Sequence, residues 1–196
     1  NEPFADLKSF AKAVGIEVIT SIPNYPPTIA TAASASPNPV SGTTAALSVL
    51  GADDSGEASL TYTWATTGTP PAGVTFSANG SNAAKNTTVT FTKAGSYTLQ
   101  ATVRDAPGLS TTSTVVVTVD QTLTSIVVAP ASASIATLAT QQFTATARDQ
   151  FAAPLTTQPT FAWSVSGGGT ISSSGLFTAG TTAGGPYTVT AQSGAT

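Results

Sequence analysis

Residues 95–108 read GSYTLQATVRDAPG, and apolar and polar residues alternate through the first ten of them. The apolar set is Tyr97, Leu99, Ala101 and Val103, and the polar set is Thr98, Gln100 and Thr102. A period of two places one set on a buried face and the other on a solvent face, which is the pattern of a half-buried β-strand. The Asp-Ala-Pro-Gly run that follows is a turn signal. This stretch therefore predicts a β-sheet protein.

The same alternation recurs on both sides of this stretch, at residues 60–64 and 115–119. Turn-forming residues rich in Pro, Gly, Asn and Asp separate these runs, at residues 37–39, 53–56, 70–73, 79–80 and 94–95. About seven strands in about 90 residues is the number in an immunoglobulin-like (Ig-like) sandwich. Residues 27–120 are therefore predicted to form one such sandwich.

A second β-rich unit follows almost at once, at residues 121–196. It starts with the apolar run at residues 126–128, and further strand-like runs lie at residues 143–147, 161–165 and 187–191. Only residues 120–122 join the two units, and so short a linker leaves little freedom between them. We expect the pair to behave as a stiff rod with limited hinge bending.

The first 26 residues differ from the rest of the chain. Apolar residues recur at helical spacing between Pro3 and Val14, and Gly15 follows them, which predicts a helix over residues 3–14. A β-branched run at residues 16–22 then predicts one strand, which the prolines at 23, 26 and 27 end. The predicted fold class is thus all-β, two tandem Ig-like sandwiches preceded by a short α/β segment. We interpret residues 1–26 as a remnant of an upstream domain or a linker.

Composition excludes several classes of chemistry. The sequence has no Cys and no His, so disulfides, thiolate metal sites and histidine bases are ruled out. Charged residues make up 8% of the chain, and six basic residues face nine acidic ones without clustering, which argues against nucleic-acid binding. No apolar run is long enough for a membrane span, and no export signal is evident at the start.

Several strings of residues resemble known extracellular modules. NYPPTI, LTYTW and AGSYTLQATVRDAPG in the first unit resemble PKD and cadherin-like Ig domains of bacterial secreted proteins. LTSIVVAPASASI, FTATARDQFAAPL and FAWSVSGGGTISSSGLFTAG in the second resemble bacterial Ig-like domains of group 2. The resemblance implies an extracellular bacterial setting, secreted or on the cell surface, beside a catalytic, adhesive or carbohydrate-binding domain.

One departure from the group-2 pattern concerns the end of the second unit. Modules of that kind continue with one more strand after the YTVTA segment, whereas this sequence ends at Thr196. We therefore expect the second sandwich to be truncated at its last strand and the chain to be a fragment. We also expect Trp64, Trp163, Tyr97 and Tyr187 to be core residues of their sandwiches.

The first candidate site is Glu2, within Asn1-Glu2-Pro3. This tripeptide resembles the acid/base motif at a strand end of barrel glycosidases similar to the cellulase clan. Retaining hydrolysis needs a second carboxylate about 5 Å away, and nothing downstream predicts a barrel that would hold one. Glu2 would then belong to a catalytic domain lying upstream, and this chain would not itself be an enzyme.

The second candidate site is acidic. Asp53, Asp54 and Glu57 fall in one predicted inter-strand loop, and Asp105 falls in the loop after the strand that begins near Tyr97. Calcium takes six to eight oxygen ligands from carboxylates and carbonyls. These four residues are the candidate calcium ligands, with a solvated polar turn as the alternative. Asp149 is interpreted as a carboxylate that fixes a turn by accepting backbone N–H bonds.

A third candidate is a lysine–asparagine isopeptide crosslink of the kind found in cysteine-free bacterial surface modules. The second unit contains no Lys, so only Lys85 or Lys93 of the first could take part. Both lie beside turn-forming residues, so we expect them in exposed loops.

The sequence as a whole predicts non-catalytic spacer or interaction modules that position a neighbouring domain of a multidomain protein. One alternative is a carbohydrate-binding accessory tail of a secreted glycoside hydrolase, with a polysaccharide or cell-surface polymer as partner. Another is a subunit of a self-assembling extracellular fibre or surface layer. Apart from calcium, no cofactor is expected.

Overall fold

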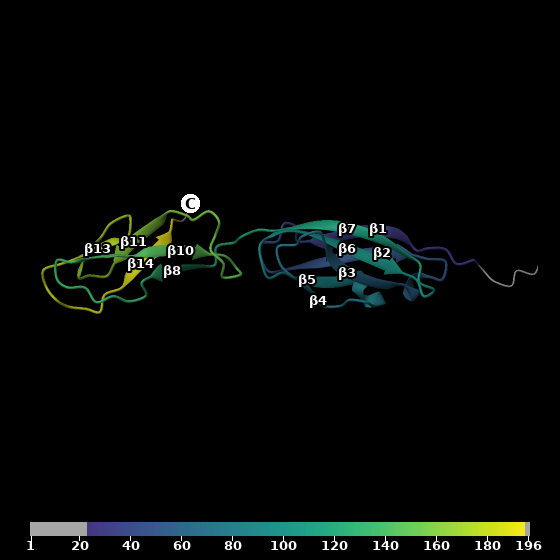
Figure 1. Cartoon of the computed structure of the whole chain (residues 1–196), viewed down its shortest axis with the longest axis horizontal. Coiled ribbons are helices and arrows are strands. Elements are labelled where there is room, and N and C mark those ends of the chain that lie inside the picture. The colour runs from purple at the N-terminus through teal and green to yellow at the C-terminus, as the bar shows by residue number, and fades with distance from the viewer. Residues whose placement is uncertain (1–22, 195–196) are drawn as a thin grey trace, which may run out of the picture.

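The computed structural model describes residues 23–194, which fold into two β-sandwiches placed end to end (Figure 1). The helix predicted at residues 3–14, the strand predicted at residues 16–22 and the candidate Glu2 lie outside the described residues. Within residues 23–194 the helical elements are two single 3₁₀ turns, η1 (Glu57–Ser59) and η2 (Asn82–Lys85). The all-β Ig-like fold class is confirmed.

The first sandwich consists of two antiparallel sheets. Its strands are β1 (Thr28–Ser36), β2 (Thr44–Ala52), β3 (Thr61–Thr67), β4 (Thr75–Phe76), β5 (Asn86–Thr90), β6 (Gly95–Arg104) and β7 (Ser110–Val119). One sheet has the order β1-β2-β5-β4 and the other has the order β3-β6-β7. Strand β6 lies at the centre of the second sheet because both of its edges are paired, with β3 and with β7.

The side chains of β6 are buried as the alternation in its sequence predicts. Tyr97, Leu99, Ala101 and Val103 are all 0% exposed. Across the sheet, Tyr62 and Trp64 of β3 are buried in the same core, where the Trp64 indole Nε1 donates a 2.8 Å hydrogen bond to the Ala84 carbonyl oxygen. Trp64 and Tyr97 are confirmed as core residues.

The second sandwich is built from shorter strands. They are β8 (Ser125–Ala129), β9 (Thr140–Gln142), β10 (Thr144–Arg148), β11 (Phe161–Val165), β12 (Gly169–Ile171), β13 (Leu176–Ala179) and β14 (Val189–Ser193). They pair as β10-β8, β11-β14 and β12-β13-β9. The buried apolar side chains of this sandwich are few: Phe143, Ala147 and Phe177.

Two expectations about the second core need correction. Tyr187 is 47% exposed and precedes β14, so it is not a core residue. Its ring instead packs over Gly167 and Gly168, whose positive φ angles of 157° and 74° bring their backbone against it. Trp163 is half-buried, and its indole lies over Gly175. The shorter strands leave both aromatic rings nearer the surface than their counterparts in the first sandwich.

Candidate functional site

The predicted calcium ligands lie at one pole of the first sandwich, but they are divided among separate interactions. Asp105 is 4% exposed, and its Oδ1 accepts hydrogen bonds from the backbone N–H groups of Gly108 (2.6 Å) and Leu109 (2.7 Å). Its Oδ2 accepts a 2.8 Å bond from the Asn24 amide. Asp105 therefore fixes the turn between β6 and β7 and fastens the chain that enters β1.

Asp53 and Asp54 lie in the turn after β2. Oδ2 of Asp53 accepts a 3.0 Å bond from the backbone N–H of Ser55, and Oδ1 is buried without a hydrogen-bond partner. The Asp54 carboxylate accepts bonds from the Tyr25 backbone N–H and the Ser55 hydroxyl. Among residues 23–194 no three acidic residues approach closely enough to share one ion. Calcium binding at Asp53, Asp54, Glu57 and Asp105 stays a prediction.

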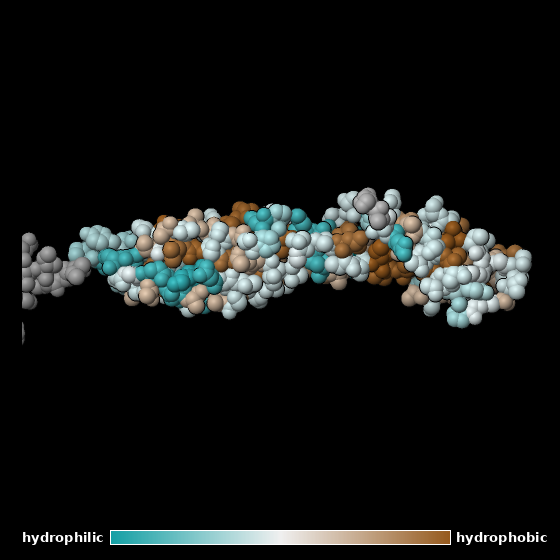
Figure 2. All heavy atoms as spheres, turned by 180° about the vertical axis from the view of Figure 1, so that it is seen from behind, coloured by the Kyte–Doolittle hydropathy of each residue, from teal (hydrophilic) through white to brown (hydrophobic). Residues whose placement is uncertain are grey.

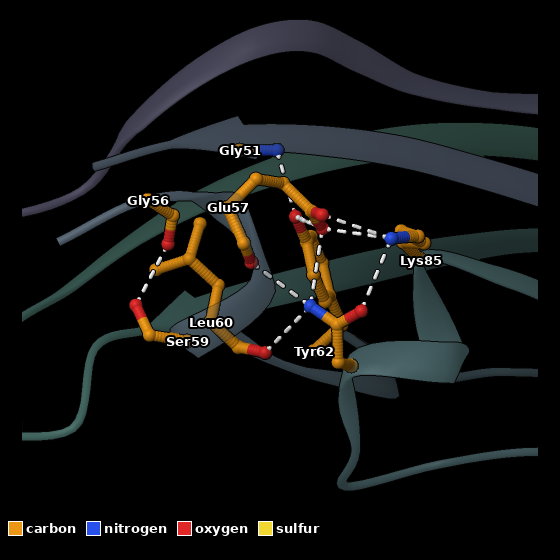
Figure 3. A network of polar contacts seen from close by, with 8 residues as sticks. Gly51, Gly56, Glu57, Ser59, Leu60, Tyr62 and Lys85 are labelled. Atoms are coloured by element: carbon orange, nitrogen blue, oxygen red, sulfur yellow. Dashed lines mark hydrogen bonds and ion pairs between the residues drawn. The ribbon is translucent and has the colours of Figure 1, made fainter.

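Glu57 belongs to a different polar network, shown in Figure 3. Lys85 Nζ lies 3.1 Å from Glu57 Oε1, 2.9 Å from Oε2 and 3.0 Å from Asn82 Oδ1. The Tyr62 hydroxyl donates a 2.9 Å bond to Glu57 Oε1 and accepts a 3.0 Å bond from the Gly51 N–H. The Lys85 ammonium is the main cause that lowers the pKa of Glu57, and burial opposes it only in part.

The meeting of Lys85, Asn82 and Glu57 brings together the residue types of an isopeptide crosslink. The amine, however, donates to both carboxylate oxygens and to the amide oxygen, which is how a charged ammonium binds. Attack on the amide carbon needs an amine with a free lone pair, whereas this amine is bound to the Glu57 carboxylate as an ion-pair donor. This network is an ion-paired bracket that joins η1 to η2. The expectation that Lys85 lies in an exposed loop is wrong, because it ends η2 and is about one-third exposed.

The second built site is the Asp149 turn, where the second sandwich meets the first. Asp149 is 2% exposed, and its Oδ1 accepts 2.9 Å bonds from the backbone N–H groups of Phe151 and Ala153. Its Oδ2 accepts a 2.9 Å bond from the Gln121 amide. The interpretation of Asp149 as a turn-fixing carboxylate is confirmed. Burial alone would raise the pKa of Asp149, but the hydrogen bonds outweigh it and the pKa lies below its ordinary value.

The turn that Asp149 fixes holds Gln150 and Phe151 against the first sandwich. Gln150 Nε2 donates to the carbonyl oxygens of Asp120 (2.7 Å) and Gly42 (3.1 Å), and its Oε1 accepts from the Thr122 N–H at 2.8 Å. Phe151 packs against the hydrophobic core cluster of the first sandwich. The Gln150 side chain thus joins the linker, the first sandwich and its own turn.

The linker adds contacts of its own. The Thr122 hydroxyl donates a 2.8 Å bond to the Ser41 carbonyl oxygen, and the backbone N–H of Asp120 donates a 2.9 Å bond to the Val40 carbonyl oxygen. Gln121 instead contacts the second sandwich, and its Oε1 accepts 2.9 Å bonds from the N–H and hydroxyl of Thr156. Consecutive linker residues therefore bind opposite sandwiches, which restrains bending at the joint.

Gln150 and Phe151 were not predicted as functional residues. The string DQFAAPL at residues 149–155 marks the turn. The alternation of apolar residues in the strand before it indicates burial within one domain, and it says nothing of contact with the preceding domain. The short linker was the available signal, since it places the turns of the two units next to each other.

A dependence of stability on pH follows from the two buried carboxylates. The pKa of Asp105 is lowered as that of Asp149 is, because its hydrogen bonds outweigh the effect of burial. A lowered folded-state pKa adds stability that is complete above the unfolded-state pKa of about 4 and is lost as pH falls through the folded value. We expect the melting temperature to be flat from pH 7 to about 5 and to fall steeply below about pH 4. Calorimetry across this range tests it, and unchanged melting at pH 3 would contradict it.

Comparison with known proteins finds one family model that matches within the first sandwich. Residues 30–118 match the family model described as PKD domain. No curated protein sequence matches the chain. The family match supports the PKD/cadherin-like character predicted for the first sandwich. PKD domains are non-catalytic Ig-like folds. The group-2 character of the second sandwich stays a prediction.

Solved structures with similar folds have low overall likeness. A nucleoside hydrolase-related hypothetical protein from Saccharophagus degradans, associated with carbohydrate metabolism, is 23% identical over 50% of this chain and 26% of its own, with a TM-score of 0.39. A PKD domain solved in solution is 25% identical over 46% of this chain and 86% of its own, with a TM-score of 0.32. The Escherichia coli adhesin FdeC is 16% identical over 91% of this chain and 62% of its own, with a TM-score of 0.36. This chain spans about a quarter of the first of these proteins.

Within residues 23–194, no helix has the length and apolar character needed to cross a bilayer.

Proposed function

We propose that this chain is a stiff, non-catalytic spacer of a secreted or surface-attached protein, which holds a neighbouring domain at a set distance. The junction around Gln150 is the observation that carries this proposal. Side chains from the linker and from both sandwiches meet there in hydrogen bonds and apolar packing. A freely hinged tether would need no such contacts.

The direction of the strands supports a spacing role. In the first sandwich, Asn24 contacts Asp105 at one pole, while Ser41 and Gly42 contact the linker and the Gln150 turn at the other. The ten residues of β7 run between these poles. At about 3.3 Å per residue a strand of this length spans about 33 Å. Figure 1 shows the two sandwiches aligned along the long axis of the molecule, so their lengths add.

The surface fits a spacer better than a carbohydrate-binding module. Flat binding of a polysaccharide needs several aromatic rings exposed on one face. Within residues 23–194, the aromatic side chains more than about a third exposed are Tyr25 at 63% and Tyr187 at 47%, and they belong to different sandwiches. A charged content of 8% also keeps non-specific ionic adhesion small.

Spin labels test the stiffness directly. The chain has no Cys, so one cysteine can be placed at Thr114 on β7 and one at Ser173 in the second sandwich, both at exposed positions. We expect a single narrow distance distribution by pulsed electron spin resonance. Replacing both Gln150 and Phe151 by alanine should broaden it, because both anchors of the turn are removed.

The matched control for that variant is Gln192→Ala, which shortens an exposed glutamine on β14 away from the junction. It should leave the distribution narrow. A wild-type distribution as broad as that of the double variant would refute the spacer proposal.

A further inference from the structure

Two asparagine side chains cover the edges of the sheet β3-β6-β7 in the way that a neighbouring strand would. At the β3 edge, Asn79 Oδ1 accepts a 2.7 Å bond from the Trp64 N–H, and Asn79 Nδ2 donates a 2.9 Å bond to the Trp64 carbonyl oxygen. At the β7 edge, Asn38 Nδ2 donates a 2.8 Å bond to the Val116 carbonyl oxygen, and its Oδ1 accepts a 3.0 Å bond from the Thr118 N–H. A carboxamide carries the donor and acceptor of a peptide group, so each side chain acts as one peptide unit of a neighbouring strand. This cover matters because an uncovered strand edge is a template for other chains.

The two asparagines differ in the residue that follows them. Asn38 precedes Pro39, whose ring nitrogen carries no N–H. Asn79 precedes Gly80, whose backbone nitrogen lies 3.1 Å from Asn79 Oδ1 and donates a 2.9 Å bond to the Tyr62 carbonyl oxygen. Asn79 and Gly80 are both exposed, and Figure 2 shows a broad hydrophilic patch on the first sandwich, at the left of that view. Solvent therefore reaches the bond between Asn79 and Gly80.

We propose that Asn79 is a site of spontaneous deamidation, and that the fold delays the reaction by holding the carboxamide on the edge of β3. The Gly80 nitrogen loses its proton to hydroxide from the solvent and attacks Cγ of Asn79. The bond from Cγ to Nδ2 breaks, and Nδ2 takes up a proton and leaves as ammonia, so that a five-membered succinimide ring remains. Water then opens the ring at either carbonyl carbon and gives aspartate or isoaspartate. The sum is the replacement of NH₂ by OH from water, with no change of oxidation state.

The native hydrogen bonds oppose this reaction at both reacting groups. Attack requires the Asn79 carboxamide to turn its Cγ toward the Gly80 nitrogen, and the two bonds to Trp64 hold it in place. The Gly80 N–H is bonded to the Tyr62 carbonyl oxygen, and loss of its proton would bring lone pairs of both atoms against each other. The reaction therefore proceeds from states in which residues 79–81 have detached from β3. We expect it to be slower in the native chain by about tenfold or more, because several hydrogen bonds must break first.

The product cannot restore the cover on β3. An ionised aspartate accepts hydrogen bonds and donates none, so its second oxygen would face the Trp64 carbonyl oxygen, to which Asn79 Nδ2 now donates. Isoaspartate also adds a methylene group to the backbone, which displaces the Ser81 carbonyl oxygen from its 3.1 Å bond with the Tyr62 N–H. A modified chain therefore detaches more readily at this edge, and the modification records that the edge has opened.

Incubation in mildly alkaline buffer, with and without guanidinium chloride, tests the site and its protection by the fold. In the denatured chain, fragmentation mass spectrometry should locate the mass increase from NH₂ to OH at residue 79, with both aspartate and isoaspartate present. The native chain should gain it more slowly. Asn38 is the internal control in both samples, because the Pro39 nitrogen cannot attack it. Gly80→Ala should slow the reaction in the denatured chain, because its methyl group crowds the attacking nitrogen.

An Asn79 that stays unmodified in the denatured chain would overturn the proposal, as would equal rates at residues 38 and 79 or equal rates in the native and denatured chains. Asn79→Asp measures the consequence of the modification without the reaction. It should unfold the first sandwich at a lower denaturant concentration than wild type. Asn86→Asp makes the same change of charge at another exposed position of this sandwich and should unfold like wild type. Equal midpoints for the two variants would contradict the role of Asn79 as the cover of β3.

Discussion

Trp64→Ala is expected to destabilise the first sandwich by about 3–5 kcal/mol, the range for removing a large aromatic side chain from a core. Trp64 is 2% exposed and lies among the largest buried side chains of the chain. Its removal leaves a cavity and leaves the Ala84 carbonyl oxygen without the indole N–H. A single domain is stable by about 5–15 kcal/mol, so this loss approaches the total for a weak domain.

Urea unfolding followed by far-ultraviolet circular dichroism measures this loss. The remaining indole, Trp163, then reports on the second sandwich by fluorescence, which should keep its own midpoint. Trp163→Ala is the matched control and should cost less, because Trp163 is only half-buried. Equal losses from the two variants would show that the cores are not packed as described.

Asp149→Ala is the second large expected effect, and it acts on both stability and shape. Two backbone N–H groups and the Gln121 amide lose their shared acceptor in a site that is 2% exposed. Each buried donor left unsatisfied costs about 1–3 kcal/mol. The turn also carries Gln150 and Phe151, so we expect the contact between the sandwiches to loosen as the second sandwich loses stability.

Chemical denaturation gives the stability part of this prediction and small-angle scattering gives the shape part. Asp54→Ala is the control, since Asp54 is an exposed aspartate in a turn of the first sandwich. It should change neither quantity appreciably. An Asp149→Ala chain as stable and as extended as wild type would show that the turn does not depend on its carboxylate.

The sequence predicted the strands best where one face is fully buried. In β6 every second residue is buried, so the period of two is unambiguous. Prediction failed for Tyr187, where a tyrosine before a strand was expected in the core but packs over glycine backbone at the surface. Nothing in the alternation distinguishes Tyr187 from Tyr97, because the difference lies in how far the strands of each sandwich extend.

The acidic residues show a second limit. The turns at one pole of the first sandwich carry all four predicted calcium ligands, Asp53, Asp54, Glu57 and Asp105. Their hydrogen-bond partners, Asn24 for Asp105 and Lys85 for Glu57, lie 81 and 28 residues away in the sequence. Spacing within a loop does not reveal such distant partners, and so it could not show that two of the four carboxylates already have structural roles.

Residual dipolar couplings of the backbone amides in both sandwiches test the stiffness of the tandem most directly. Each sandwich yields its own alignment tensor from the same sample. If the Gln150 junction holds the two as one body, the tensors will agree in magnitude and orientation in the frame of this structure. A markedly smaller tensor for the second sandwich would mean that it reorients freely about residues 120–122, and the account of this chain as a stiff spacer would be wrong.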